Sequence, residues 1–155
     1  MCVMDNIIEK LTTKNDKEAC AFADKIIKDS KETDCWYKYF DDFACLLSHP
    51  KSLLRNRVLN ILAENAKWDK ENRFDGIIEE YLKHITDEKP ITSRQCIKAL
   101  REVGKSKKQY ISRIIKSFHE ADLSQYKESM RPLIEKDMAE SEEILRNVNA
   151  ICSII

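Results

Sequence analysis

Hydrophobic and polar positions in the middle of the chain follow a pattern that repeats after 38 residues. The shift needs no gap across two helix-like segments and the turn between them. The aligned apolar positions are Phe40, Phe43, Leu47, Leu53, Leu59 and Leu62, which fall on Ile78, Tyr81, Ile85, Ile91, Ile97 and Leu100. The acidic residues Asp41 and Asp42 fall on Glu79 and Glu80. A period of about 35 to 45 residues built from helix pairs is typical of an α-solenoid, so the pattern predicts an all-α protein of this architecture.

Apolar residues at helical spacing predict four helix pairs, over residues 4–31, 34–66, 71–104 and 108–152. In the first pair, residues 4–12 form a short helix and Asp16 is the expected N-cap of the helix that follows. Asp34 is the expected N-cap of the first helix of the second pair. Pro50 ends that helix, because the residue before a proline is pushed out of the α region.

The later helices are predicted over residues 51–66, 71–85, 91–104, 108–120 and 125–152, which gives seven to eight helices in all. Gly104 is expected at the C′ position of its helix, a position that favours glycine. Pro132 leaves two alternatives for the last helix, because proline removes a backbone donor and clashes with the preceding turn. Either the helix begins near Ser129, or it is kinked at Pro132. The apolar end of the chain, residues 144–155, is expected to cap the last layer.

The chain has 155 residues and is expected to form one domain over residues 1–155. Charged residues make up 35% of it, and it contains only two glycines and three prolines. That composition suits helices with solvated outer faces. No stretch approaches the roughly 20 apolar residues of a membrane span, and the first residues lack the basic and apolar regions of a signal peptide. The sequence therefore predicts a cytoplasmic protein.

The formal net charge of zero hides a mild asymmetry. Residues 51–110 carry 14 basic and 9 acidic side chains, whereas residues 1–50 carry 7 and 10, and residues 111–155 carry 6 and 8. This excess of positive charge in the middle is far below the basic footprint of a nucleic-acid-binding protein. A nucleic-acid partner is therefore not expected.

The six cysteines and three histidines give little indication of a metal site. No two cysteines have C-x-x-C spacing, and no cysteine lies at zinc-site spacing from a histidine. His49, His84 and His119 are 35 residues apart, which places them out of register with the 38-residue repeat. We therefore expect no metal and no cofactor. The cysteines are expected to be reduced, several of them acting as small buried hydrophobes.

The repeat resembles that of HEAT-repeat proteins, with an acidic pair in the first helix and arginines in the second. The segments FDDF, SLLRNR, ENAKWDKENRFD, ITDEKPITSRQCIKAL and YKESMRPLIEKD, within residues 34–140, are similar to a group of small bacterial HEAT-like proteins. Some of that group are labelled SufBD-like, after an iron–sulfur assembly scaffold. The resemblance implies a curved, right-handed superhelical stack of antiparallel helix pairs whose second helices line the concave surface.

Basic residues recur on one face of the helix predicted over residues 91–104. They are Arg94, Lys98, Arg101 and Lys105, at positions i, i+4, i+7 and i+11. In the preceding pair Asn56 and Asn60 take the places of Arg94 and Lys98. If these helices line the concave surface, the ridge could receive an acidic peptide or a phosphate group. The alternative is a solvated face whose charges only keep the protein soluble.

Trp68 and Arg131 complete the set of candidate partner-binding residues. Trp68 lies in a connection between pairs and would be a contact residue if exposed, because aromatic residues dominate binding hot spots. Its alternative role is to fill the gap between stacked pairs. Arg55, Arg57 and Arg131 have the alternative role of bridging to acidic residues of neighbouring layers.

These features favour a scaffold that binds a protein or acidic peptide on the concave face and has no catalysis of its own. It is expected to be a monomer or a weak dimer. Two alternatives stay open. A HEAT-like DNA glycosylase would need a basic groove and an aromatic pocket with a carboxylate. An accessory factor in iron–sulfur or metal assembly would need clustered cysteine and histidine ligands.

Overall fold

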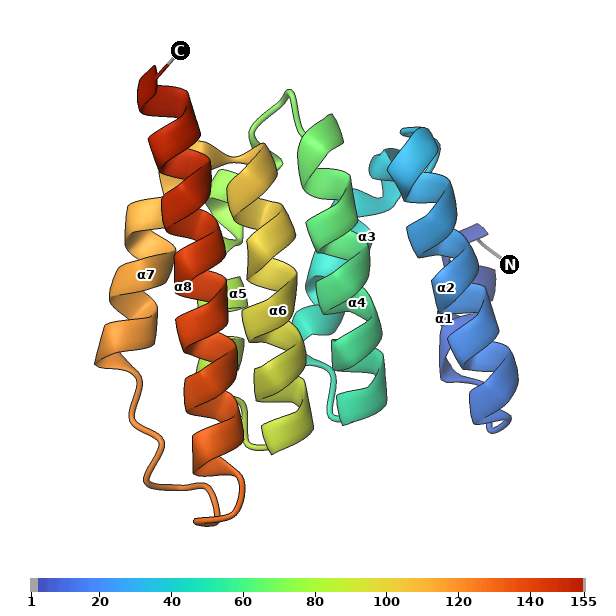
Figure 1. The fold of residues 1–155 in the computed structure, drawn as a ribbon. Coiled ribbons are helices and arrows are strands. Elements are labelled where there is room, and N and C mark those ends of the chain that lie inside the picture. The colour runs from blue at the N-terminus through green and yellow to red at the C-terminus, as the bar shows by residue number, and fades with distance from the viewer. Residues whose placement is uncertain (1–2, 155) are drawn as a thin grey trace.

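The computed structural model describes residues 3–154, with side chains described for residues 3–150. This part of the protein is entirely helical and contains eight α-helices (Figure 1). They are α1 (Val3–Thr12), α2 (Asp16–Glu32), α3 (Phe40–Cys45), α4 (Ser52–Asn65), α5 (Ile78–Leu82), α6 (Pro90–Ser106), α7 (Ile111–Glu120) and α8 (Arg131–Ile154). The prediction of an all-α protein with seven to eight helices is confirmed for these residues.

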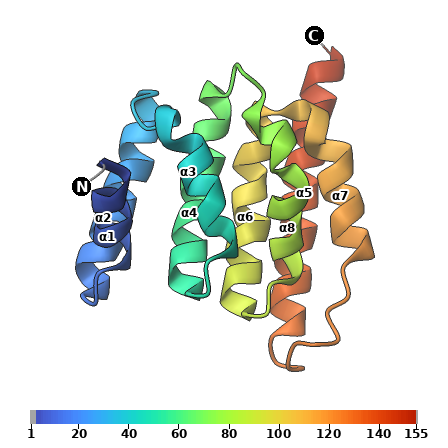
Figure 2. The same cartoon turned by 180° about the vertical axis from the view of Figure 1, so that it is seen from behind.

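The helices lie in two layers, which Figures 1 and 2 show from opposite sides. The even-numbered helices α2, α4, α6 and α8 form one layer, and each packs against the next. All four begin at the same end of the layer, so they run parallel to one another (Figure 1). The odd-numbered helices form the other layer and run in the opposite direction.

The core fills the space between the layers and contains a cluster of aromatic rings. Phe74 lies between Phe40 and Tyr81, with ring-centroid distances of 5.3 and 5.7 Å. These three side chains are almost wholly buried. The hydroxyl of Tyr81 donates to the carbonyl oxygen of Leu59 at 2.6 Å, so its burial leaves no donor unpaired. The aromatic cluster therefore fixes how the α3–α4 and α5–α6 pairs pack together.

The first helices of the second and third pairs are shorter than the sequence predicts. Residues 34–48 contain only the six-residue α3 between two 3-10 turns, and Asp34 accepts the N–H of Tyr37 through its backbone oxygen, so the prediction that it caps a helix is wrong. Residues 71–85 are likewise divided into α5 and two 3-10 turns. The first of these turns begins at Asp69's hydrogen bonds, since its carboxylate accepts the backbone N–H groups of Arg73 and Phe74.

Two other predicted helix ends are also corrected. The N-cap of α2 is Asn15, whose side chain accepts the N–H of Glu18 at 3.3 Å, whereas Asp16 is the first residue of the helix. Gly104 does not end its helix, because α6 continues to Ser106. A Cβ atom at Gly104 would lie 2.2 Å from Cδ2 of Leu145. This position thus needs glycine for the close approach of α6 and α8.

Pro132 lies in the first turn of α8, which begins at Arg131. Of the two alternatives for the last helix, the structure therefore agrees with a start near this point. A proline is tolerated there because the first N–H groups of a helix have no intrahelical acceptor. Of residues 144–155, which were expected to cap the last layer, Leu145 is fully buried, and the side chains of residues 151–155 lie outside the described residues.

Three of the four described cysteine side chains, Cys20, Cys35 and Cys45, are exposed. Only Cys96 among them is buried, so the expectation of several buried cysteines is wrong for this part of the chain. Cys2 and the side chain of Cys152 lie outside the described residues. Within the described range, none of the helices has both the length and the apolar character needed to cross a membrane.

Candidate functional site

The outward side of α4 and α6 carries the same stripe of residues twice. In α4 and the turn after it, the stripe is Leu53, Asn56, Arg57, Asn60, Glu64 and Lys67. In α6, each position 38 residues further on is again outward-facing: Ile91, Arg94, Gln95, Lys98, Glu102 and Lys105. All twelve side chains are exposed or half-buried. We call these twelve positions, together with the neighbouring outward side of α8, the second-helix face.

The two stripes share an ion pair at the same place. Glu64 lies 3.6 Å from Lys67, and Glu102 lies 3.1 Å from Lys105. The stripes are also joined directly, because the side-chain amide of Asn60 donates to the side-chain oxygen of Gln95 at 3.2 Å. Four of the predicted site residues, Asn56, Asn60, Arg94 and Lys98, therefore lie on one continuous surface. Arg101 lies beside this surface on α6 and is half-buried.

The basic ridge on α6 faces acidic and hydroxyl groups of α8. The Nε atom of Arg94 donates to Asp137 at 2.5 Å, and Nζ of Lys98 lies 3.9 Å from the same carboxylate. Arg101 donates to Ser141 at 2.7 Å. The side chain of Asp137 is only 5% exposed, so this single carboxylate holds two cations against the surface. The hydrogen bond to Asp137 also raises the pKa of Arg94 above its usual value.

Trp68 and Arg131 do not join the basic ridge. The indole N–H of Trp68 donates to the carbonyl oxygen of Ser30 at 2.7 Å, so this half-buried side chain closes the gap between α2 and α4. Arg131 donates to the backbone oxygens of Tyr126 and Ser124, at 2.8 and 3.0 Å. Its contacts therefore hold the α7–α8 connection and do not bridge to an acidic residue.

Arg57 reaches from α4 to the first helix pair. It donates to the backbone oxygen of Leu11 at 3.0 Å, and its guanidinium lies 3.9 Å from the carboxylate of Asp16. Asp16 is also 3.8 Å from Nζ of Lys51. Arg57 thus bridges to an acidic residue of a neighbouring pair, as predicted, but over the long distance of 3.9 Å. The carboxylate of Asp16, like that of Asp137, lies near two cations.

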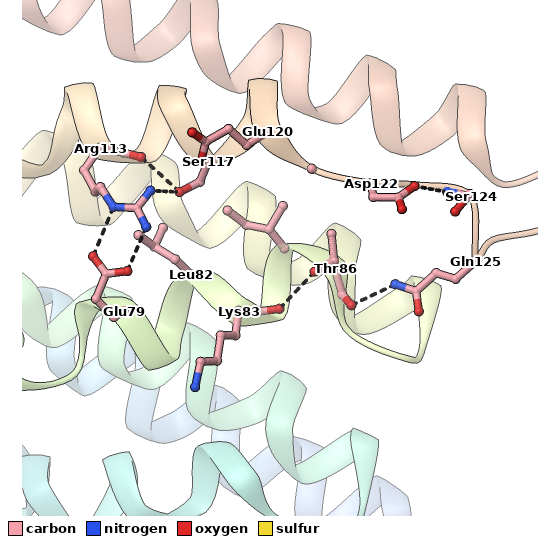
Figure 3. A pocket seen from close by; sticks show the side chains of 12 residues that line it. Glu79, Leu82, Lys83, Thr86, Arg113, Ser117, Glu120, Asp122, Ser124 and Gln125 are labelled. Carbon is pink, nitrogen blue, oxygen red and sulfur yellow. Dashed lines mark hydrogen bonds and ion pairs between the residues drawn. The ribbon is translucent and has the colours of Figure 1, made fainter.

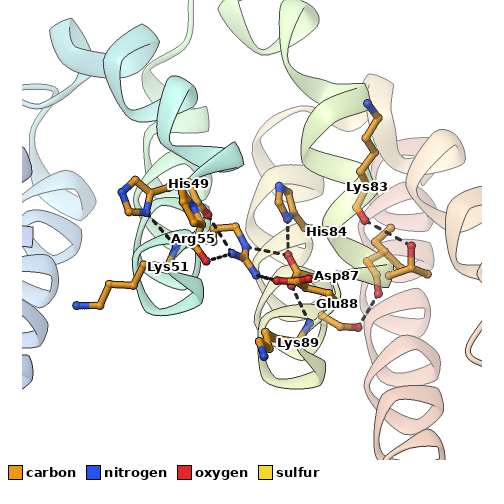
Figure 4. A network of polar contacts seen from close by, with 12 residues as sticks. His49, Lys51, Arg55, Lys83, His84, Asp87, Glu88 and Lys89 are labelled. Atoms are coloured by element: carbon orange, nitrogen blue, oxygen red, sulfur yellow. Dashed lines mark hydrogen bonds and ion pairs between the residues drawn. The ribbon is translucent and has the colours of Figure 1, made fainter. Parts of the chain in front are cut away.

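A buried polar network lies at the end of the layers where α4 and α6 begin (Figure 4). The carboxylate of Asp87 accepts two hydrogen bonds from Arg55, at 2.8 and 3.1 Å, and one from the backbone N–H of Lys89 at 2.9 Å. Its Oδ2 lies 2.8 Å from Nδ1 of His84. Arg55 also donates to the backbone oxygens of His49 and Pro50. The prediction that Arg55 bridges to an acidic residue of a neighbouring helix pair is confirmed.

Asp87 is almost fully buried, which by itself raises its pKa. The hydrogen bonds from His84, Arg55 and the backbone of Lys89 outweigh this effect and leave the pKa well below its usual range. Because both Arg55 and Asp87 are buried and fully hydrogen-bonded, this ion pair has the contacts of a structural cross-link and offers no open coordination position.

A second buried carboxylate, Asp69, lies at the opposite end of the layers. It accepts hydrogen bonds from the Tyr37 hydroxyl at 2.5 Å and from the backbone N–H groups of Arg73 and Phe74, both at 2.8 Å. The ammonium group of Lys107 lies 3.2 Å away and also donates to the Asp69 backbone oxygen. Burial raises the pKa of Asp69, but these partners lower it below its usual value. Both ends of the central pairs are therefore joined by buried charges.

The layer of odd-numbered helices, which we call the first-helix layer, contains an open cleft of about 570 Å³ between α5 and α7 (Figure 3). Arg113 lies along it and pairs through two nitrogens with Glu79, at 2.7 and 3.0 Å. A third nitrogen donates to Ser117. Asp41, which precedes Glu79 by 38 residues, makes a single longer contact of 3.4 Å with Arg73, whose shorter pair is with Glu71 at 2.8 Å. Both repeated acidic residues therefore face an arginine of the following unit, and Glu79 neutralises Arg113 within the cleft.

The histidines are separated in the structure. His84 binds Asp87, and His119 binds Glu142. Nδ1 of His49 accepts the backbone N–H of Lys51 at 3.0 Å. Among the described residues, no group of three or more histidine, cysteine, aspartate or glutamate side chains could hold a metal ion.

Residues of the second-helix face that sequence reasoning missed are Leu53, Ile91 and Leu133. Their side chains are 40%, 63% and 40% exposed. In the repeat, Leu53 and Ile91 count only as matching apolar positions. Their spacing nevertheless indicates exposure, because Leu53 lies three and seven residues before Asn56 and Asn60 and so lies on the polar side of its helix.

Comparisons with known proteins find no family model, no curated protein and no solved structure that matches this chain. The resemblance to small HEAT-like proteins therefore stays a prediction from the sequence. What the protein can do must be inferred from the geometry of its own surfaces.

Proposed function

We propose that this protein is a HEAT-like α-solenoid scaffold that binds a protein or peptide on its second-helix face. In this proposal it catalyses no reaction itself, acts in the cytoplasm and is a monomer or weak dimer. Its proposed repeat units are the four helix pairs predicted over residues 4–31, 34–66, 71–104 and 108–152. Their parallel second helices are the feature on which the solenoid assignment depends.

One observation supports this function above the others: an outward-facing stripe is repeated in register on two adjacent parallel helices. Each stripe begins with an exposed aliphatic residue, continues with hydrogen-bonding side chains and ends with a Glu–Lys ion pair. Exposure to solvent alone does not require a particular order of side chains along a helix. A ligand that crosses both helices does require such an order, because it contacts equivalent positions on each helix in turn.

The charges of the second-helix face favour an acidic partner. Lys51 and Arg57 share the carboxylate of Asp16, and Arg94 and Lys98 share the carboxylate of Asp137. Each group therefore retains an excess of positive charge at the surface. Complementary charge steers association and selects among partners.

The test is affinity isolation from native lysate with two double variants. On the second-helix face, Lys98→Glu with Lys105→Glu changes side chains that are 46% and 49% exposed. The matched control, Lys83→Glu with Lys116→Glu, changes two lysines of the first-helix layer that are 72% and 68% exposed. The net charge change is the same in both.

We expect a protein that is retained by the wild-type chain and the control and lost by the second-helix variant. Retention by the second-helix variant together with loss by the control would move the binding surface to the other layer and contradict the proposal. Arg94 is left unchanged in this test, because it makes the short 2.5 Å hydrogen bond to the buried carboxylate of Asp137, whereas Lys98 lies 3.9 Å from that carboxylate.

A further inference from the structure

Three exposed aliphatic side chains lie in the first turns of three neighbouring helices of one layer. Leu53 is in the first turn of α4, Ile91 in that of α6 and Leu133 in that of α8. Among the described residues, the only other large hydrophobic side chain with comparable exposure is Val3 in α1. We call Leu53, Ile91 and Leu133 the aliphatic row.

The aliphatic row is continuous because its helices are neighbours. Helix α6 packs against both α4 and α8, and all three helices begin at the same end of the layer (Figure 1). The contact between Arg94 and Asp137, which follow Ile91 and Leu133 by three and four residues, places the first turns of α6 and α8 at about the same level. In α2 the first turn is Asp16, Lys17 and Glu18, so the row ends at α4.

An exposed aliphatic side chain is common when it stands alone, but a line of them marks a contact surface. In the first turn of a helix these positions face solvent, and polar residues would serve there equally well. Burial of each side chain by a partner would remove apolar surface from water, which is the main driving force of association. The row therefore fits a partner that carries aliphatic side chains at matching intervals.

Basic residues surround the row. Lys51 and Lys89 directly precede α4 and α6. One turn further along, the stripes carry Arg57 and Arg94, and then Lys98. These basic residues share their acidic partners, since Asp16 faces both Lys51 and Arg57, and Asp137 faces both Arg94 and Lys98. A partner with acidic residues between its aliphatic ones would supply the missing negative charge.

We propose that the aliphatic row binds an acidic segment in the polyproline II conformation that crosses α4, α6 and α8 and has an aliphatic residue at every third position. Packed helices lie about 8–10 Å apart. Polyproline II has three residues per turn and rises about 3.1 Å per residue, so every third side chain lies on the same side of the segment, about 9 Å from the last. Successive aliphatic side chains of such a segment therefore reach successive helices. This inference rests on the proposed function and adds the chemistry and spacing of the ligand.

The test uses a fluorescein-labelled synthetic peptide, (Leu-Glu-Asp)4, and measures its binding to the full chain by fluorescence anisotropy. We compare the wild type with the triple variant Leu53→Ser, Ile91→Ser, Leu133→Ser. The expected loss of affinity is roughly thirty-fold, from three partly buried aliphatic side chains. The matched control is Val3→Ser, which removes an equally exposed aliphatic residue outside the row and should leave the affinity unchanged.

Two further probes test the spacing and the charge. A peptide with the same composition but leucine at alternating positions should bind more weakly, and (Leu-Lys-Arg)4 should not bind. Because the substituted side chains are exposed, urea unfolding of the triple variant should match that of the wild type. A loss of peptide binding in a variant of unchanged stability then reports on the surface itself.

Several results would overturn the inference. One is equal affinity of the peptide for the wild type and the triple variant, and another is no binding to the wild type at millimolar concentration. Concentration-dependent self-association that the triple variant abolishes would assign the row to a second copy of this chain. Binding to phosphatidylserine vesicles without binding to the peptide would assign it to a lipid surface. In each case the effect of Lys98→Glu with Lys105→Glu on partner capture still tests the proposed function separately.

Discussion

The charges buried at the ends of the helix pairs and those on the second-helix face have very different surroundings. Asp87 and Asp69 are each almost fully buried, and each carboxylate receives several hydrogen bonds from side chains and backbone. On the face, by contrast, one carboxylate of Asp137 serves two cations, and Lys98 remains 46% exposed.

The difference shows which charges are needed for folding. A buried carboxylate without partners is strongly unfavourable, so its full set of donors must come from the protein. An exposed cation keeps water as an alternative partner and can exchange it for a ligand. Folding should therefore depend on the buried networks, whereas binding should depend on the exposed side chains of the second-helix face, and variants of those exposed side chains should leave stability nearly unchanged.

The largest expected effect on stability comes from the Asp87→Ala variant. It leaves the buried guanidinium of Arg55 without its charged partner, and breaking a buried ion pair costs about 3–5 kcal/mol. Urea denaturation followed by circular dichroism measures the change. The control is Glu88→Ala, whose side chain is 74% exposed and should alter the free energy of unfolding by less than about 0.5 kcal/mol. Equal effects of the two variants would remove the distinction between buried and exposed charges.

The Gly104→Ala variant is expected to have the next largest effect. Its new Cβ would lie 2.2 Å from Cδ2 of Leu145, a fully buried side chain that must then shift. Overpacking of this kind costs about 1–3 kcal/mol. Gly76→Ala is the matched control, because its Cβ would meet no atom within 4 Å. Thermal unfolding of both variants should show a lower midpoint for Gly104→Ala only, which would establish that the helices beneath the face are in close contact.

Acid should weaken the buried networks. The pKa values of Asp69 and Asp87 are lowered in the folded protein, so their stabilisation is present above the unfolded value of about 3.9 and is lost as the pH falls below it. Urea midpoints measured from pH 6 to pH 2.5 should decrease most steeply below about pH 4. The Asp87→Asn variant should be less stable at neutral pH and show a shallower decrease. A slope identical to that of the wild type would contradict the role given to Asp87.

The smallest effect on stability is expected from Lys98→Ala. Its contact with Asp137 is long and partly exposed, and such pairs contribute about 0–1 kcal/mol. The same variant should weaken binding of the (Leu-Glu-Asp)4 peptide, more so at low salt than at high salt because the interaction is screened. The exposed pair between Arg113 and Glu79 in the other layer provides the comparison, since Arg113→Ala should change stability by a similar amount and binding not at all.

The repeat made part of this structure predictable from the sequence. The bounds of α4 and the start of α6 follow from apolar periodicity and from Pro50, just before α4, and Pro90, the first residue of α6. The interruption of residues 71–85 does not, and the segment begins where the side chain of Asp69 binds backbone N–H groups four and five residues later. A side-chain contact of this kind has no signature in helical periodicity.

The candidate site was predictable to a similar extent. The spacing of Arg94, Lys98 and Arg101 placed them correctly on one side of α6. Their pairing with α8 could not be foreseen, since Asp137 lies 43 residues from Arg94 and the connection before α8 shifts the repeat. The exposure of Ile91 was missed because an apolar residue aligned with Leu53 suggests a core position.

The most direct test of the second-helix face is site-specific photo-crosslinking in native extract. Benzoyl-phenylalanine is placed at position 98 in one protein and at position 116 in another, where Lys116 is 68% exposed on α7. We predict a crosslinked partner from position 98 that is competed by excess unlabelled wild-type chain, and none from position 116. Adducts from position 116 alone, or none from position 98, would contradict the assignment of binding to the second-helix face.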